Sequence, residues 1–223
     1  MKKKFYLAHL YPDYLNFPRD SDNPNFLKRR AIETGLEFEI DHLTIGDLFD
    51  PEKYDFVFIG GGADSAQRKV SDDLIKIKGV SLRQAIEDGV VMLCICGGYQ
   101  LMGQRYVDLE GYEMKGLGVL DLETIAEPER IAGDLQFEAD LPLVDRILSG
   151  IEEHAGRTYL GKNVKPLGRV IQGSGNNGLD KTEGVQYKNL IGTYAHGGFL
   201  PNNPQIADYL IKLAKQRQGF AMP

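Results

Sequence analysis

Cysteine is scarce in this 223-residue sequence, and its placement excludes two common roles. The only two cysteines, Cys94 and Cys96, are separated by one residue, a spacing that suits neither a disulfide nor a Cys-x-x-Cys metal site. We therefore expect reduced thiols and a cytoplasmic location. The four histidines also lack the spacing of metal ligands, so no metal site is expected.

Long apolar runs and an excess of positive charge are missing as well. The longest apolar stretch, residues 90–96, is far shorter than the ~18 residues of a membrane-spanning helix. The apolar stretch after the N-terminal lysines is too short for a signal peptide. Lys plus Arg number 26 against 32 Asp plus Glu, which disfavours non-specific nucleic-acid binding. The sequence therefore predicts no stable membrane insertion and no nucleic-acid partner.

Phosphate-binding loops are absent too. Residues 173–178 fit the pattern G-x-G-x-x-G, but they lie late in the chain and are followed by LDKTEG rather than by a helical pattern. They therefore do not indicate a dinucleotide site. The pattern G-x-x-x-x-G-K-S/T does not occur, so we expect no cofactor and no ATP on this chain.

What is present indicates a folded domain of the α/β class. Hydrophobic residues make up 42% of the chain and charged residues 26%, as in globular proteins. Apolar strands are predicted at residues 4–10, 56–59 and 90–95, and an alternating strand at residues 36–43. Helices are expected to begin at Asn23, Ser65 and Ser81 between these strands, and residues 81–84 have the spacing of a capping box. Strands that are apolar on both faces indicate a parallel sheet covered by helices.

The second half of the chain has a more antiparallel pattern. Short strands are predicted at residues 117–122, 131–139, 168–172, 185–187 and 190–194, with few helices between them. A last helix is expected from Asn203-Pro204 onward. No repeat or linker divides the sequence, so a single domain over residues 1–223 is predicted.

The strongest local candidate for chemistry is Cys96, which follows an apolar strand and precedes Gly97-Gly98 and a helical pattern. This resembles a nucleophile elbow, in which a strained turn exposes the nucleophile and small neighbours admit the substrate. The start of a helix also favours the thiolate. The alternative is that Cys96 is only a small buried hydrophobe, the role we expect for Cys94.

A nucleophilic thiol needs a base, and His196 has the best context for one. It follows a predicted strand and precedes Gly197-Gly198 on an open loop. His9 and His42 lie within strand patterns, and His154 is an intermediate case. The glycines at residues 60–62 and Gly97 offer backbone N–H groups for an oxyanion. The alternative for residues 60–62 is a tight turn that requires positive φ.

Several segments carry a resemblance to known enzymes. Residues 96–103 (CGGYQLMG) and 192–197 (GTYAHG) together resemble the class I glutamine amidotransferases, in the branch that includes cobyric acid synthase. Further segments resemble, in order, the GatD family of glutaminase subunits of lipid II isoglutaminyl synthase. These are residues 11–13 (YPD), 58–62 (FIGGG), 130–134 (RIAGD), 154–158 (HAGRT), 175–178 (GNNG) and 183–189 (EGVQYKN).

The resemblance implies a role for individual residues. Cys96 would attack the side-chain amide of L-glutamine, and His196 would act as general base and acid. Backbone N–H groups of Gly61 and Gly97 would stabilise the oxyanion. For the substrate itself, two residues are implied: Arg130 for the carboxylate of glutamine and Gln100 as part of the pocket lining.

The chain also departs from the pattern. Many class I enzymes carry a Glu two residues after the histidine, where this chain has Gly198, and residues 16–23 differ from the family's usual stretch. The triad is therefore expected to be incomplete here, with the missing acid supplied by a MurT-like ligase subunit in a heterodimer. That partner would also bind ATP and magnesium.

The resemblance thus implies a cytoplasmic glutaminase subunit that supplies ammonia for amidation of the D-glutamate of a lipid-linked peptidoglycan precursor. Two alternatives remain open at this point. One is a glutaminase that serves another acceptor, such as a corrinoid carboxylate. The other is a catalytically silent module that regulates a ligase.

Overall fold

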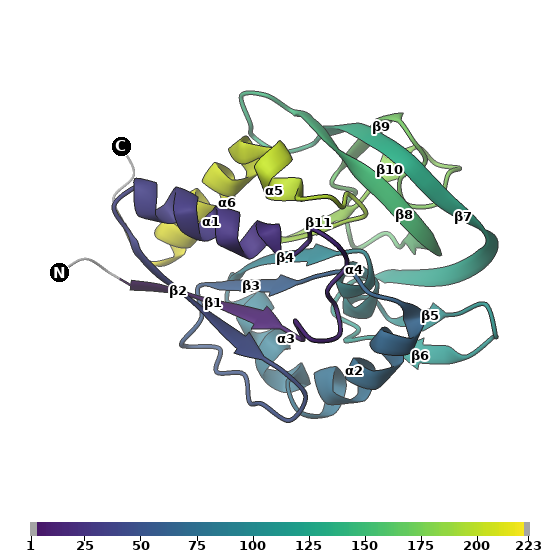
Figure 1. Ribbon diagram of the computed structural model, residues 1–223, viewed down its shortest axis with the longest axis horizontal. Coiled ribbons are helices and arrows are strands. Elements are labelled where there is room, and N and C mark those ends of the chain that lie inside the picture. The colour runs from purple at the N-terminus through teal and green to yellow at the C-terminus, as the bar shows by residue number, and fades with distance from the viewer. Residues whose placement is uncertain (1–3, 221–223) are drawn as a thin grey trace.

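A computed structural model describes residues 4–220, and its centre is a six-stranded sheet (Figure 1). In sheet order the strands are β11 (Val185–Tyr187), β12 (Leu190–Thr193), β4 (Val91–Ile95), β3 (Phe56–Ile59), β1 (Lys4–Leu10) and β2 (Glu37–Leu43). The strands from β12 to β2 are parallel, and β11 pairs antiparallel with β12. The predicted α/β class with a largely parallel central sheet is confirmed.

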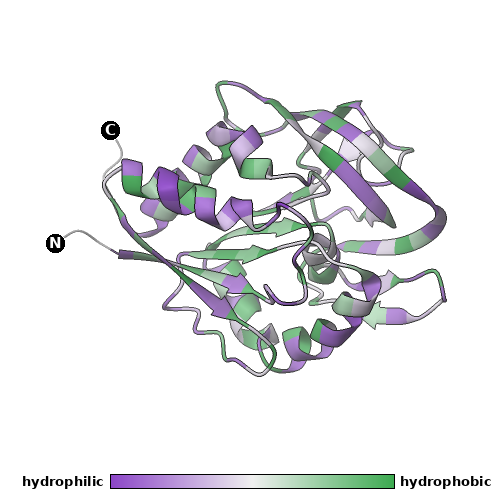
Figure 2. Ribbon diagram, viewed as in Figure 1, coloured by the Kyte–Doolittle hydropathy of each residue, from purple (hydrophilic) through white to green (hydrophobic). Residues whose placement is uncertain are grey.

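Helices cover both faces of this sheet. Figure 1 shows α1 (Asp22–Glu33), α5 (Phe199–Asn202) and α6 (Pro204–Arg217) on one face and α2 (Asp64–Lys76) and α3 (Gly79–Glu87) on the other. Every residue of β3 and β4 is buried as a result, and Figure 2 shows the hydrophobic colour concentrated in the central strands. Burial on both faces explains why these strands are continuous apolar runs rather than alternating ones.

A second sheet holds most of the remaining chain. Its order is β10 (Thr182–Glu183), β9 (Gly168–Gln172), β7 (Leu122–Ala139), β5 (Arg105–Val107) and β6 (Glu113–Lys115), and β8 (Ile147–Leu160) also pairs with β7. All pairs are antiparallel except β5 with β7. The predicted change to antiparallel strands in the second half is therefore confirmed.

Two local predictions are wrong, and one long strand was missed. Residues 117–121 form a loop instead of a strand, because Leu117 and Gly118 donate their N–H groups to Leu101 and Gly103 around the end of α4 (Gly97–Met102). Helix α3 begins at Gly79 without a side-chain cap, so Ser81 does not cap it. The long strand β8 was not predicted, because buried polar residues such as Glu152, His154 and Arg157 interrupt any apolar alternation.

Every helix in the described part of the chain is too short or too polar to cross a membrane.

Candidate active site

Cys96 lies in a strained turn between β4 and α4. Its backbone has φ 47° and ψ −105°, values that are rare for a residue other than glycine. A Cβ on Gly98 would come within 2.6 Å of the Ile59 carbonyl oxygen. The Gly97-Gly98 pair therefore lets α4 start directly against β3, in the strand-to-helix turn that the sequence predicts for Cys96.

His196 reaches Cys96 because of the strand order. β12 is the parallel neighbour of β4, so the residues that follow the two strands meet at the carboxyl edge of the sheet. The backbone N–H of His196 donates to the carbonyl of Ile151 in β8 at 2.8 Å, which fixes the loop against the second sheet. The imidazole is almost completely buried, with 1% of the residue exposed.

Asp20 supplies the carboxylate that the sequence did not reveal. Nδ1 of His196 lies 3.0 Å from Oδ2 and 3.2 Å from Oδ1 of Asp20, and since a carboxylate only accepts, Nδ1 is the donor. The expectation that this chain lacks an acid for His196 is therefore wrong. The position two residues after the histidine is unsuited to a glutamate, because Gly198 has φ 77°.

The charge of His196 follows from these contacts. Burial lowers the pKa of the imidazole, but the charge of Cys96 and the hydrogen bond and charge of Asp20 outweigh burial and raise that pKa to about 10. Nε2 of His196 is buried and has no hydrogen-bond partner within residues 4–220. A protonated His196 complements the negative charge of a thiolate, the nucleophilic form of cysteine.

Gly61 follows β3 and closes the site from the other side of Cys96. A Cβ at this position would lie 2.6 Å from Cε1 of His196 and 3.3 Å from Cβ of Cys96. None of the glycines at 60–62 has positive φ, so close packing, rather than the turn considered above, requires them.

The two backbone N–H groups expected to bind an oxyanion differ in their partners. The Gly61 N–H donates to Oδ2 of Asp20 at 3.0 Å. Gly97 begins α4, and its N–H has no partner within that helix.

A cavity of about 510 Å³ opens beside Cys96. Gln100 and Arg130 line it, as the resemblance implies. The Arg130 guanidinium is 56% exposed and lies 3.4 Å from a carboxylate oxygen of Glu153. The volume of the cavity suits an amino acid, and the guanidinium of Arg130 can bind a carboxylate there.

Hydrogen bonds hold Gln100 in the wall of the cavity. Its Oε1 accepts from Nε2 of Gln67 at 3.0 Å, and its Nε2 donates to the hydroxyl of Tyr194 at 3.0 Å. Gly156 makes room for the amide, because a Cβ there would lie 2.5 Å from Nε2 of Gln100. Gln100 is thus held by Gln67 of α2 and by Tyr194, which follows β12.

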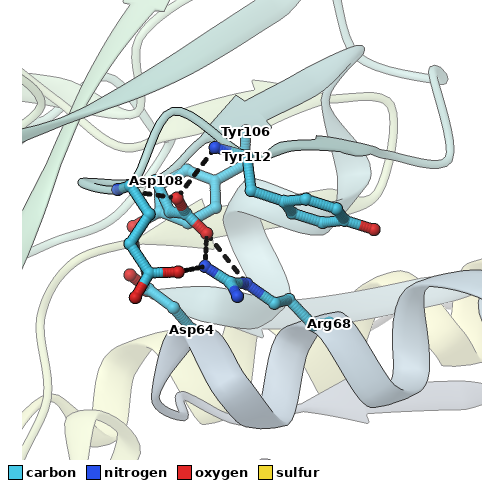
Figure 3. Close-up of polar contacts among 6 residues, drawn as sticks. Asp64, Arg68, Tyr106, Asp108 and Tyr112 are labelled. Atoms are coloured by element: carbon cyan, nitrogen blue, oxygen red, sulfur yellow. Dashed lines mark hydrogen bonds and ion pairs between the residues drawn. The ribbon is translucent and has the colours of Figure 1, made fainter.

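Charged residues that the sequence did not single out also line the cavity, and Figure 3 shows the polar contacts among them. Arg68 of α2 donates to Asp108 through Nε at 2.8 Å and to Glu110 at 2.7 Å, and the Tyr106 hydroxyl donates to Asp64 at 2.9 Å. Neither α2 nor the β5–β6 loop carries a sequence motif at these positions. The two segments are distant in the sequence, and folding brings their side chains together.

The other histidines are separate from the reacting pair. His9 and His42 pack edge to face with ring centroids 5.3 Å apart on β1 and β2. His154 lines the cavity, and its ring stacks on Tyr194. Residues 173–178 form turns and no helix, so their glycine pattern heads no nucleotide-binding unit.

A cysteine at a strained strand-to-helix turn, with histidine and aspartate beside it at the edge of a parallel sheet, defines a cysteine hydrolase site on an α/β fold. Comparison with solved structures shows to which class of proteins this fold belongs. PurLQS from Thermotoga maritima superposes with a TM-score of 0.64 at 18% identity, covering 97% of each chain. A solved glutamine amidotransferase gives a TM-score of 0.61 at 16% identity, over 93% of this chain and 98% of the other. The fold is that of the class I glutamine amidotransferases.

Sequence comparison shows the family of this chain. Residues 7–204 match the CobB/CobQ-like glutamine amidotransferase domain, and the chain belongs to this family of glutamine amidotransferases. The GatD subunit of lipid II isoglutaminyl synthase from Staphylococcus aureus is 42% identical over 96% of this chain and 86% of its own length. The GatD subunit from Streptococcus pneumoniae is 38% identical over 95% and 81%. A cobyric acid synthase from Pelotomaculum thermopropionicum is more distant, at 34% over 63% of this chain and 29% of its own.

Proposed function

We propose that this chain is the glutaminase subunit of a lipid II isoglutaminyl synthase, acting in the cytoplasm with a MurT-like ligase subunit. The observation that carries the proposal is the contact of His196 with both Cys96 and Asp20 beside a cavity that contains Arg130. The GatD relatives, which match over nearly the whole chain, support the choice of acceptor.

In the proposed reaction, Arg130 binds the α-carboxylate of glutamine and the side-chain amide lies against Cys96. The Cys96 sulfur attacks the amide carbon, and the N–H groups of Gly61 and Gly97 stabilise the oxyanion of the tetrahedral intermediate. For Gly61 this requires its N–H to exchange Asp20 for the substrate oxygen.

His196 then transfers a proton to the amide nitrogen, the C–N bond breaks, and ammonia leaves behind a glutamyl thioester. Water attacks the thioester while His196 accepts its proton, which releases glutamate and returns the sulfur as thiolate. Asp20 orients the imidazole through both steps and stabilises its positive charge.

The ammonia is used by the partner in this proposal. A MurT-like subunit would bind ATP and magnesium, activate the D-glutamate carboxylate of the lipid-linked stem peptide and amidate it. The absence of a phosphate-binding loop motif from this sequence supports this division between two subunits.

Glutamate release from glutamine tests the chemistry. We would measure it for the chain alone and for the complex with a co-expressed MurT-like subunit, in wild type and Cys96→Ala. Activity that depends on Cys96 and rises with the partner is the expected result. A wild-type complex no faster than Cys96→Ala would contradict the glutaminase proposal and leave the silent regulatory module.

The acceptor needs its own assay. The complex is supplied with ATP, magnesium and glutamine, together with either lipid II or a corrinoid carboxylate, and the amidated product is detected by mass spectrometry. Amidation of lipid II alone supports the proposal, and amidation of the corrinoid alone overturns the choice of acceptor while the glutaminase chemistry stands.

A further inference from the structure

His154 in β8 is a buried histidine, and one of its ring nitrogens has no partner among the residues that the structure describes. The residue is 2% exposed and lines the cavity beside Cys96. Its ring stacks on Tyr194 with centroids 3.7 Å apart and planes 11° apart, which fixes the orientation of the imidazole. Nε2 makes no hydrogen bond within residues 4–220, a costly state for a buried polar atom.

The protonation state of this histidine is determined by its surroundings. Nδ1 lies 2.7 Å from the Gly156 carbonyl oxygen, and because a carbonyl only accepts, Nδ1 carries the hydrogen. Burial lowers the pKa of His154 to about 3, with the positive charges of Arg157, His196 and Arg130 acting in the same direction. Nε2 of the neutral ring is therefore a hydrogen-bond acceptor for which residues 4–220 supply no donor.

The same surroundings limit what can supply the missing donor. An ammonium group carries N–H donors, but here it would meet the positive charges of Arg130, Arg157 and His196. A carboxylate fits that field but has no hydrogen to donate. A carboxamide N–H is a donor without net charge, and it satisfies both conditions.

A second acceptor in the cavity wall lacks a donor too. Oε1 of Gln67 is buried without a hydrogen bond among the described residues, and Gln67 lines the same cavity. The orientation of this amide is determined because its Nε2 must donate to the Gly62 carbonyl at 3.3 Å. A primary amide nitrogen carries two N–H groups, whereas a carboxylate or an ester oxygen carries none.

We propose that Nε2 of His154 accepts a hydrogen bond from the carboxamide N–H of the substrate and so selects a primary amide over the corresponding carboxylate. This inference rests on the proposed glutaminase function and assigns a specificity residue to it. A site built around a buried acceptor binds the matching donor and disfavours the acid, because the acid leaves the acceptor unpaired.

Removing the acceptor and removing the donor should have the same effect. The variant His154→Phe keeps an aromatic ring against Tyr194 but has no acceptor. Its kcat/KM is measured, in complex with the MurT-like subunit, for L-glutamine and for the γ-methyl ester of L-glutamate, which lacks the N–H. We expect a loss of about 10- to 100-fold for glutamine and a change of less than about threefold for the ester. Equal losses for both substrates would overturn the proposal.

The variant His154→Gln returns an acceptor oxygen near the position of Nε2, and we expect it to recover most of the glutamine activity. Recovery no better than in His154→Phe, with both variants folded, would contradict the proposal.

A second measurement needs no change at His154. In Cys96→Ala, which binds substrate without turning it over, the ¹⁵N resonance of His154 Nε2 should shift with glutamine and stay unchanged with the γ-methyl ester. An unchanged resonance at saturating glutamine overturns the assignment even where glutaminase activity is intact. A wild-type complex that releases no glutamate contradicts the proposed function instead, so the two failures are distinguishable.

Discussion

The imidazole of His196 and the carboxylate of Asp20 are 3.0 Å apart although 176 residues separate them in the sequence. Both side chains are about 1% exposed, and the carboxylate also accepts the Gly61 N–H. Asp20 therefore connects the histidine to the proposed oxyanion donor. A carboxylate in this place makes the Cys–His–Asp arrangement complete within one chain.

Replacing Asp20 by Asn should lower kcat for glutamine hydrolysis by about 10²- to 10⁴-fold, because the amide no longer stabilises a charged, oriented imidazole. The measurement is glutamate release by the complex with the MurT-like subunit. Asp22→Asn, on an exposed neighbour, is the matched control and should retain wild-type activity. If Asp20→Asn stays within about threefold of wild type, the acid acting on His196 comes from the partner.

The raised pKa of His196 predicts a pH dependence of stability. The ordinary value is 6.5 and the folded value is about 10, so the charged form contributes stability that is full below pH 6.5 and is lost as the pH rises through 10. Cys96→Ala removes one of the interactions that raise this pKa. We expect its His196 to titrate at a lower pH by NMR, and its unfolding free energy to fall less between pH 6.5 and 10 than that of wild type.

Two results would contradict this account: the same His196 titration in both proteins, or a stability that falls equally in both over that range.

Gly61 is predicted to tolerate no side chain. A Cβ would lie 2.6 Å from Cε1 of His196, so Gly61→Ala must displace the histidine or the glycine loop, and a shift of about 1 Å costs on the order of 10²-fold in rate. Gly46→Ala is the control, since φ there is 89° with open space around it. It should lower stability by about 1 kcal/mol and leave kcat unchanged. Equal kcat values for the two variants would contradict the steric argument.

The parts of this site that sequence reasoning reached are those with local signals. Cys96 was predictable because its apolar strand, its glycines and the helical pattern after it are contiguous, and the turn they form has φ 47° at Cys96. The carboxyl edge of the sheet was predictable as the place where Cys96 and His196 meet, since both follow apolar strands.

Asp20 was missed because its role depends on a loop after β1 that folds across the sheet edge. Its neighbour Phe17 packs against the His196 ring at a tilt of 36° with centroids 4.2 Å apart, and the Phe17 N–H donates to the Gly61 carbonyl at 2.9 Å. Nothing in residues 16–23 has a period or motif that records these contacts. An aspartate in the loop after the first strand of a parallel sheet is the only signal available, and it is a weak one.

Arg130 provides the test of substrate binding. Its ion pair with Glu153 is solvent-exposed at 3.4 Å, and such pairs contribute little, so a substrate carboxylate can replace Glu153 at small cost. Arg130→Ala should raise KM for glutamine by about 10- to 100-fold and change kcat by less than about threefold, because the lost contact is present in the ground state and the transition state alike.

Arg146→Ala is the matched control for that measurement. Arg146 is an exposed arginine, also paired with a glutamate, and it lines a different cavity, so its loss should leave KM unchanged. Glu153→Gln frees the Arg130 guanidinium and should keep KM equal to wild type or lower it. A KM that rises as much in Glu153→Gln as in Arg130→Ala would mean that the ion pair itself shapes the cavity, and the carboxylate of glutamine would then have to bind elsewhere.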